Sequence, residues 1–102
     1  MTTILVVHPD LAERIVISIQ LESEGLSPVA VASAQRALER LATTPVDLVL
    51  ADQPTLGALR DGLGATPTLA LGTPSVRLPM HAEVLANAIR VTLANAHHRR
   101  VA

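Results

Sequence analysis

Short apolar runs alternate with stretches of helical periodicity along this sequence. The apolar runs predict strands over residues 3–7, 29–32, 46–51 and 67–71. Apolar residues at helical spacing predict helices over about 11–24, after Ser33, within 55–62 and over 82–98. Strands that alternate with helices in this way form a parallel sheet joined by right-handed crossovers. The pattern therefore predicts one α/β domain over residues 1–102.

The first predicted helix has two competing patterns. An apolar stripe at helical spacing consists of Leu11, Ala12, Ile15, Val16 and Ile19. A period of two, which is typical of a strand, is shared by Ile15, Ile17, Ile19 and Leu21. Asp10 and Glu13 have the spacing of a capping box in which Glu13 reaches back, and Gly25 suits a helix end. These end signals favour a helix, with the stripe as its packing face.

Two later helices have simpler patterns. Ser33 is expected to cap the first of them, whose inward side consists of Ala34, Ala37, Leu38 and Leu41. The helix over 82–98 has one side made of Leu85, Ala88, Ile89, Thr92, Leu93 and Ala96. Its last turn holds His97, His98, Arg99 and Arg100. Adjacent side chains diverge on a helix, so this end is interpreted as a solvated basic turn and not as a metal site.

Composition narrows the class of protein. The chain is 49% hydrophobic and 17% charged, as expected of a globular domain, and its net charge of −1 gives no reason to expect a nucleic-acid partner. It has no cysteine, no lysine and no aromatic residue, so thiol chemistry is excluded and the core must be aliphatic. No apolar run reaches the ~20 residues of a membrane span. We expect a cytoplasmic protein without a membrane partner.

The run over 46–51 leads into the main candidate residue. Asp52 follows this run directly, and Gln53-Pro54 comes next. In open α/β sheets, ligands and chemistry gather at the carboxyl ends of the strands. Asp before Pro also commonly caps the turn or helix that follows. Asp52 is therefore either a reactive carboxylate or a helix cap.

Ile4-Leu5-Val6-Val7 followed by His8-Pro9-Asp10, together with the run that ends in Asp52, resembles a response-regulator receiver domain. The resemblance implies a flavodoxin/CheY-like three-layer fold with a parallel sheet of order 2-1-3-4 and a fifth strand. It also implies that Asp52 is the phosphoacceptor for a histidine kinase. An acidic pair after the first strand would hold Mg²⁺ in that family.

Most other functional positions of the family are altered. The acidic pair falls on His8 and Pro9, with Asp10 one place late. The family's hydroxyl position falls on Gly72, with Thr73 next to it. Its lysine position falls on Leu78, with Arg77 next to it, and its aromatic position falls on Ser75. Pro79 matches the family's proline. Proline offers no ligand and Mg²⁺ prefers oxygen donors, so a degenerate pseudo-receiver is predicted, with slow or absent phosphorylation of Asp52.

The segment after the fourth predicted strand is too short for the helix that a receiver has there. Only three residues separate the fourth strand from residues 75–79, where a fifth would lie, whereas a parallel crossover needs about a dozen. The receiver's fourth helix is therefore predicted to be missing. Residues 75–79 would run antiparallel, form a connector or exchange with another chain. The fourth strand's edge and the 82–98 helix then become the expected partner surface.

Several functions fit this pattern. The first is a regulatory module of two-component phosphorelay signalling that works by protein–protein interaction or dimerisation, with a histidine kinase, an output domain or a second copy as partner. The second is a working phospho-receiver that uses Asp52 and Mg²⁺. A third binds a cyclic dinucleotide through Arg77, Arg90, Arg99 and Arg100. A structural pairing of His8 with Asp52, or a metal site of His8, Asp10 and Asp52, is also considered. No enzyme motif is present.

Overall fold

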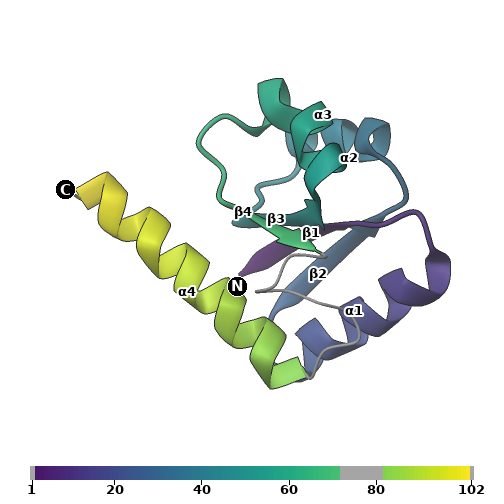
Figure 1. Cartoon of the computed structure of the whole chain (residues 1–102), viewed down its shortest axis with the longest axis horizontal. Coiled ribbons are helices and arrows are strands. Elements are labelled where there is room, and N and C mark those ends of the chain that lie inside the picture. The colour runs from purple at the N-terminus through teal and green to yellow at the C-terminus, as the bar shows by residue number, and fades with distance from the viewer. Residues whose placement is uncertain (1, 72–81, 102) are drawn as a thin grey trace.

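The computed structural model describes residues 2–71 and 82–101, with the side chains of residues 97–101 left out. Its strands are β1 (Thr3–Val7), β2 (Ser27–Val31), β3 (Leu48–Asp52) and β4 (Thr68–Leu71). They form a parallel sheet, as the sequence pattern predicted, in the order β2-β1-β3-β4 that the receiver resemblance implied (Figure 1). Every β-to-β connection that the structure describes passes through a helix, which parallel pairing requires.

Two helices cover each face of the sheet. These are α1 (Leu11–Ser23) and α4 (Ala82–Val101) on one face, and α2 (Ala34–Thr43) and α3 (Gln53–Leu63) on the other (Figure 1). The two central strands, β1 and β3, send alternate side chains to the two faces. Ile4 and Val6 join the cluster under α1 and α4, whereas Leu5 and Val7 join the cluster under α2 and α3. The three-layer α/β fold expected from the sequence is therefore present.

Strand β3 begins two residues later than predicted. The apolar run suggested 46–51, but the strand covers Leu48–Asp52. Asp47 explains the shift, because its Oδ2 accepts from the backbone N–H of Thr3 at 2.7 Å and its own N–H donates to the Thr3 carbonyl at 2.9 Å. This carboxylate thus fixes the register at the amino ends of β1 and β3. The following helix, α3, is also longer than the range 55–62 predicted, since Asp52 caps it and Pro54 lies in its first turn.

The predicted packing face of α1 is wrong. Ile17 and Leu21 are fully buried, whereas Leu11, Ile15, Val16 and Ile19 are 62%, 50%, 49% and 61% exposed. Residues two positions apart on a helix point about 200° apart, so a helix that buries Ile17 turns Ile15 and Ile19 to solvent. We call the exposed set Leu11, Ala12, Ile15, Val16 and Ile19 the α1 stripe.

Both ends of α1 are fixed by local hydrogen bonds. Asp10 caps the helix by accepting from the N–H of Glu13 at 3.1 Å, as predicted. The other half of the capping box is not as predicted, because the N–H of Asp10 donates to Nδ1 of His8 and not to Glu13. At the far end Gly25 takes φ 78°, and the N–H of Leu26 donates to the Leu21 carbonyl at 3.0 Å. This is the glycine-terminated helix end that the sequence indicated.

The remaining helices follow the predicted faces closely. Ser33 caps α2, Ala37 is buried, and Ala34 and Leu41 pack against the same cluster, although Leu38 is 39% exposed. On α4, Leu85, Ala86 and Ile89 are buried, and Ala88 and Leu93 pack beside them. The predictions for Gly72, Thr73, Leu78 and Pro79, and for the path of residues 72–79, lie outside the described residues.

Candidate functional site

The carboxyl edge of the sheet brings two predicted site residues side by side. Strands β1 and β3 are adjacent and parallel, with Val6 opposite Leu50. The same register, continued by two residues, sets His8 at the end of β1 beside Asp52 at the end of β3. Figure 1 shows this edge at the points where β1 leads into α1 and β3 leads into α3. The resemblance predicted this juxtaposition.

Asp52 is the N-cap of α3. Its Oδ1 accepts from the backbone N–H of Thr55 at 2.8 Å. Hydrogen bonds from the side chain and backbone of Thr55 lower the pKa of Asp52; partial burial opposes this shift, and the nearby His8 adds the smallest lowering effect. The carboxylate is exposed and held in its charged form. The capping alternative considered for Asp52 is therefore confirmed, while its role as phosphoacceptor stays a prediction.

The loop between β1 and α1 is held together by its own residues. Nδ1 of His8 accepts from the Asp10 N–H at 3.1 Å. A guanidinium nitrogen of Arg14 donates to the carbonyls of His8 at 2.7 Å and Pro9 at 3.1 Å. Between the described side chains of His8 and Asp52 the structure shows no hydrogen bond or close ion pair, and their interaction is the electrostatic effect of His8 on the pKa of Asp52.

Arg14 is the site residue that the sequence did not reveal. A basic residue in the first turns of a helix is usually solvated, and no motif marks it. Here its positive charge sits on the loop that carries the acidic pair in receivers. The only signal in the sequence was the short distance from Pro9 to Arg14, which allows a long side chain to fold back over the loop.

The residues present do not fit a Mg²⁺ site. Asp10 and Asp52 each accept a hydrogen bond from a helix N-terminus, and Pro9 offers no side-chain ligand. Arg14 adds a positive charge that opposes a cation at the loop. Among the side chains of residues 2–71 and 82–96, no three His, Cys, Asp or Glu residues could hold a metal ion. The considered metal site of His8, Asp10 and Asp52 is therefore not assembled.

Of the four arginines considered for binding a cyclic dinucleotide, Arg90 is the one whose side chain the structure describes. Arg90 on α4 donates to the Glu24 carbonyl at the end of α1, at 3.2 Å. Arg77 lies outside the described residues, as do the side chains of Arg99 and Arg100. Arg90 therefore serves as a link between α4 and α1 in the described part of the chain.

The α1 stripe is the second feature of functional interest. Its large members are about half exposed or more, and they lie on the face of α1 that points away from the sheet. Val84 and Val91 of the neighbouring α4 are 47% and 51% exposed. Exposed apolar side chains that gather on one helix indicate an interaction surface more than isolated ones do. The sequence showed these residues but assigned them to the core.

Solved structures of other proteins share this arrangement, although no protein-family model and no curated protein matches the sequence. A sensor protein from Polaromonas sp. JS666 aligns with TM-score 0.82 and 17% identity, over 93% of this chain and 98% of that chain. A CheY-like response regulator receiver domain protein from Methanospirillum hungatei JF-1 gives 0.80 and 16%, over 97% and 98%. The chemotaxis response regulator CheY4 of Vibrio cholerae gives 0.74 and 18%, over 90% and 98%. The chain has the CheY-like receiver fold.

The helices carry no membrane-spanning segment in the part of the chain that the structure describes. Even α4, with 20 residues, lacks the apolar length that such a span needs.

Proposed function

We propose that this domain is a regulatory module of two-component phosphorelay signalling that acts through protein–protein contacts, without a phosphorylation switch. The proposal rests on the residues at the carboxyl edge of the sheet and on their hydrogen bonds. Asp52 is engaged as a helix cap, His8 and Pro9 stand where a receiver needs carboxylates, and Arg14 of α1 donates to their carbonyls. The proposal assigns the domain no catalytic activity, no cofactor and no contact with nucleic acid, and places it in the cytoplasm.

The electrostatics of this edge disfavour phosphoryl transfer. A phosphoryl group that moves to a carboxylate needs cations placed to neutralise the charge that develops on it. The family's means of doing so is a metal held by the acidic pair, and His8 and Pro9 stand in those positions. Arg14 is a cation, but its guanidinium already donates hydrogen bonds to the His8 and Pro9 carbonyls. These features support a role for the domain that does not depend on phosphorylation.

The partner surface is proposed on the helices. From the sequence we expected the β4 edge and the 82–98 helix to bind a histidine kinase, an output domain or a second copy. Val84 and Val91 on α4 support that expectation. The α1 stripe adds a larger apolar surface, since its four large residues are each 49% to 62% exposed. Removing such surface from water contributes about 25 cal/mol per Å², which favours a partner that covers it.

A working phospho-receiver is the second candidate function. Asp52 is exposed and its pKa is lowered, so a charged and accessible carboxylate stands where the receiver family has its phosphoacceptor. This alternative requires Mg²⁺ to bind despite the ligand set described above.

An NMR titration separates the two candidates. ¹⁵N–¹H spectra of the whole chain would be recorded with Mg²⁺ and then with beryllofluoride, for the natural sequence, Asp52→Asn and Asp52→Ala. Asparagine retains a capping oxygen, so Asp52→Asn changes the acceptor chemistry without removing the cap. We expect no response in any of the three. Shifts at residues 8–10 and 52–54 that vanish in Asp52→Asn would establish the phospho-receiver instead.

A further inference from the structure

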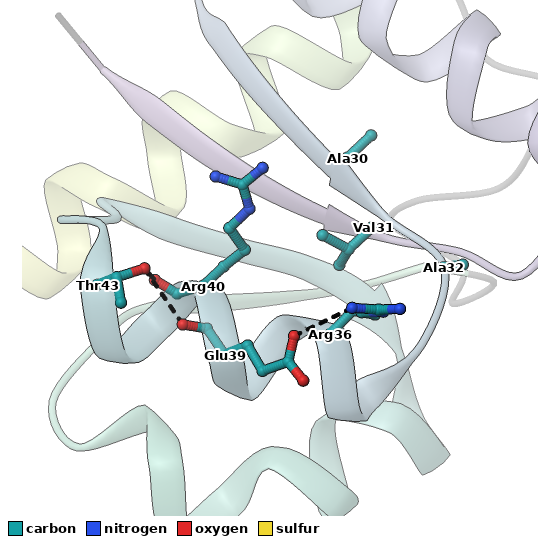
Figure 2. Close-up of a pocket in the computed structure, with 7 residues that line it drawn as sticks. All are labelled: Ala30, Val31, Ala32, Arg36, Glu39, Arg40 and Thr43. Carbon is teal, nitrogen blue, oxygen red and sulfur yellow. Dashed lines mark hydrogen bonds and ion pairs between the residues drawn. The ribbon is translucent and has the colours of Figure 1, made fainter.

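The outer edge of β2 has an open strand position beside two arginines. β2 is the last strand on its side of the sheet in the described residues, and it pairs only with β1. Next to it, Arg36, Glu39 and Arg40 of α2 line a hollow of about 570 Å³ together with residues 30–32. Figure 2 shows the side chains of both arginines reaching out from α2 near Ala30 and Ala32. This hollow borders the carboxyl end of β2, but neither His8, Asp52 nor the α1 stripe lines it.

The backbone of β2 determines which groups face outward. The N–H of Ser27 and the carbonyl of Val31 both bond to the β1 side, at 2.8 and 3.1 Å. In a parallel strand the backbone groups of alternate residues point to opposite edges, so those of Pro28 and Ala30 point outward. Pro28 has no N–H to leave unpaired, which is why proline is tolerated there. Ala30 therefore presents its N–H and its carbonyl at an exposed edge.

The positive charges beside this edge favour an acidic ligand. Arg36 and Arg40 are one turn apart on α2 and both are exposed. Glu39 pairs with Arg36 at 3.4 Å, but the two side chains are 56% and 70% exposed, and such a surface pair is weak. A carboxylate from a ligand can therefore displace Glu39 at little cost. A second copy of this chain is disfavoured as the ligand, because pairing of two β2 edges would bring Arg36 and Arg40 of both copies together and their positive charges would repel.

We propose that the β2 edge binds an acidic peptide segment in extended conformation, which adds as a strand beside Ala30. Main-chain hydrogen bonds to Ala30 would provide the docking, as in other cases of strand addition. Acidic side chains of the peptide would meet Arg36 and Arg40. This site does not depend on the proposed signalling function, since it uses neither Asp52 nor the α1 stripe.

The test uses the whole chain and a capped synthetic peptide in which glutamate alternates with valine. Exchange of the Ala30 amide proton with solvent would be followed by NMR with and without the peptide. We expect Ala30 to exchange rapidly alone and slowly in the complex, with shifts confined to β2 and α2. Peptides with lysine for glutamate, or with N-methylated backbone amides, should not protect Ala30.

Matched charge variants complete the test. Arg36→Gln and Arg40→Gln, made one at a time, should each weaken binding roughly threefold at low salt, whereas Arg60→Gln removes the same charge elsewhere and should leave it unchanged. Ala30→Pro removes the outward N–H without touching the ladder to β1, and should abolish binding. If Ala30→Pro does not fold, the N-methylated peptide probes the same bond.

Three results would overturn the proposal. The first is the absence of any shift up to millimolar peptide. The second is binding that leaves Ala30 unprotected or survives N-methylation, which would reduce the site to an ionic contact. The third is protection of Ala30 that grows with protein concentration and needs no peptide, which would make a second copy the occupant.

Discussion

Helices α1 and α2 lie on opposite faces of one sheet, and they use their side chains differently. On α2, the apolar residues lie on one side and Arg36, Glu39 and Arg40 on the other, so the buried side is the apolar one. On α1, apolar residues occupy both sides: Ile17 and Leu21 are buried and the α1 stripe is exposed. A helix that is apolar on both sides needs a second surface to cover the outer one. This difference is the reason why the proposed partner surface includes α1 and not α2.

The largest expected effect tests which side of α1 is buried. Ile17→Ala should lower the free energy of unfolding by about 2–5 kcal/mol, because it leaves a cavity in a fully packed cluster. Ile15→Ala, on the half-exposed stripe, should cost less than about 1 kcal/mol. Urea unfolding followed by circular dichroism measures both, since the chain has no tryptophan. Equal losses would mean that the stripe predicted from the sequence packs in the core after all.

Helix caps provide the next comparison. Asp10 on α1 and Ser33 on α2 each accept one backbone N–H, at 3.1 and 3.3 Å. Asp10→Ala and Ser33→Ala should each cost about 1 kcal/mol of stability. Asp10→Asn and Ser33→Asp keep a capping oxygen and serve as matched controls in the same urea experiment. A cap whose alanine and control variants are equally stable contributes nothing to its helix.

The cap of α3 differs from that of α2 because it can titrate. Hydrogen bonds from Thr55 lower the pKa of Asp52 in the folded chain, so the charged form stabilises the fold. That contribution is complete above the unfolded pKa of about 3.9 and is lost as the pH falls through the lower folded value. The urea midpoint should therefore drop more on acidification for the natural chain than for Asp52→Asn. Parallel curves for the two proteins below pH ~4 would contradict this role of the carboxylate.

The smallest stability effects are expected on the outer surfaces of both helices. Ile19→Gln on α1 and Glu39→Gln on α2 should each change the free energy of unfolding by less than about 0.5 kcal/mol. Only Ile19→Gln removes apolar surface from the α1 stripe. It should therefore reduce self-association in light scattering at high protein concentration, or binding once a partner is known. A large loss of stability in Ile19→Gln would show that this side chain is buried.

Much of the fold could be predicted from the sequence because its signals are local. The strand over Thr3–Val7 and the caps at Asp10, Ser33 and Asp52 follow from short patterns that need no distant partner. Asp47 shows the limit of such signals. It looked like an interruption of a strand, but its hydrogen bonds to Thr3 reach across 44 positions of the sequence.

The candidate site was predictable in part. Asp52 was found from its place after a buried run, and the resemblance placed His8 beside it. Arg14 was missed, because its contacts are with backbone carbonyls that every sequence has. The α1 stripe was seen but assigned to the wrong environment, since its spacing is the same whether it faces a sheet or water.

The resemblance implied the strand order, which is confirmed, and the replacement of a receiver's acidic pair by His8 and Pro9, which stays a prediction. The sequence by itself determined where strands and helices form and that the run before Asp52 makes a buried central strand. These depend on residue type and period along the chain. Only the tertiary structure decided the rotation of α1, the commitment of Arg14 to the β1–α1 loop and the exposed edge at Ala30. The reason is physical: burial and hydrogen bonding depend on which surfaces meet, and two apolar sides of one helix cannot both face the same sheet.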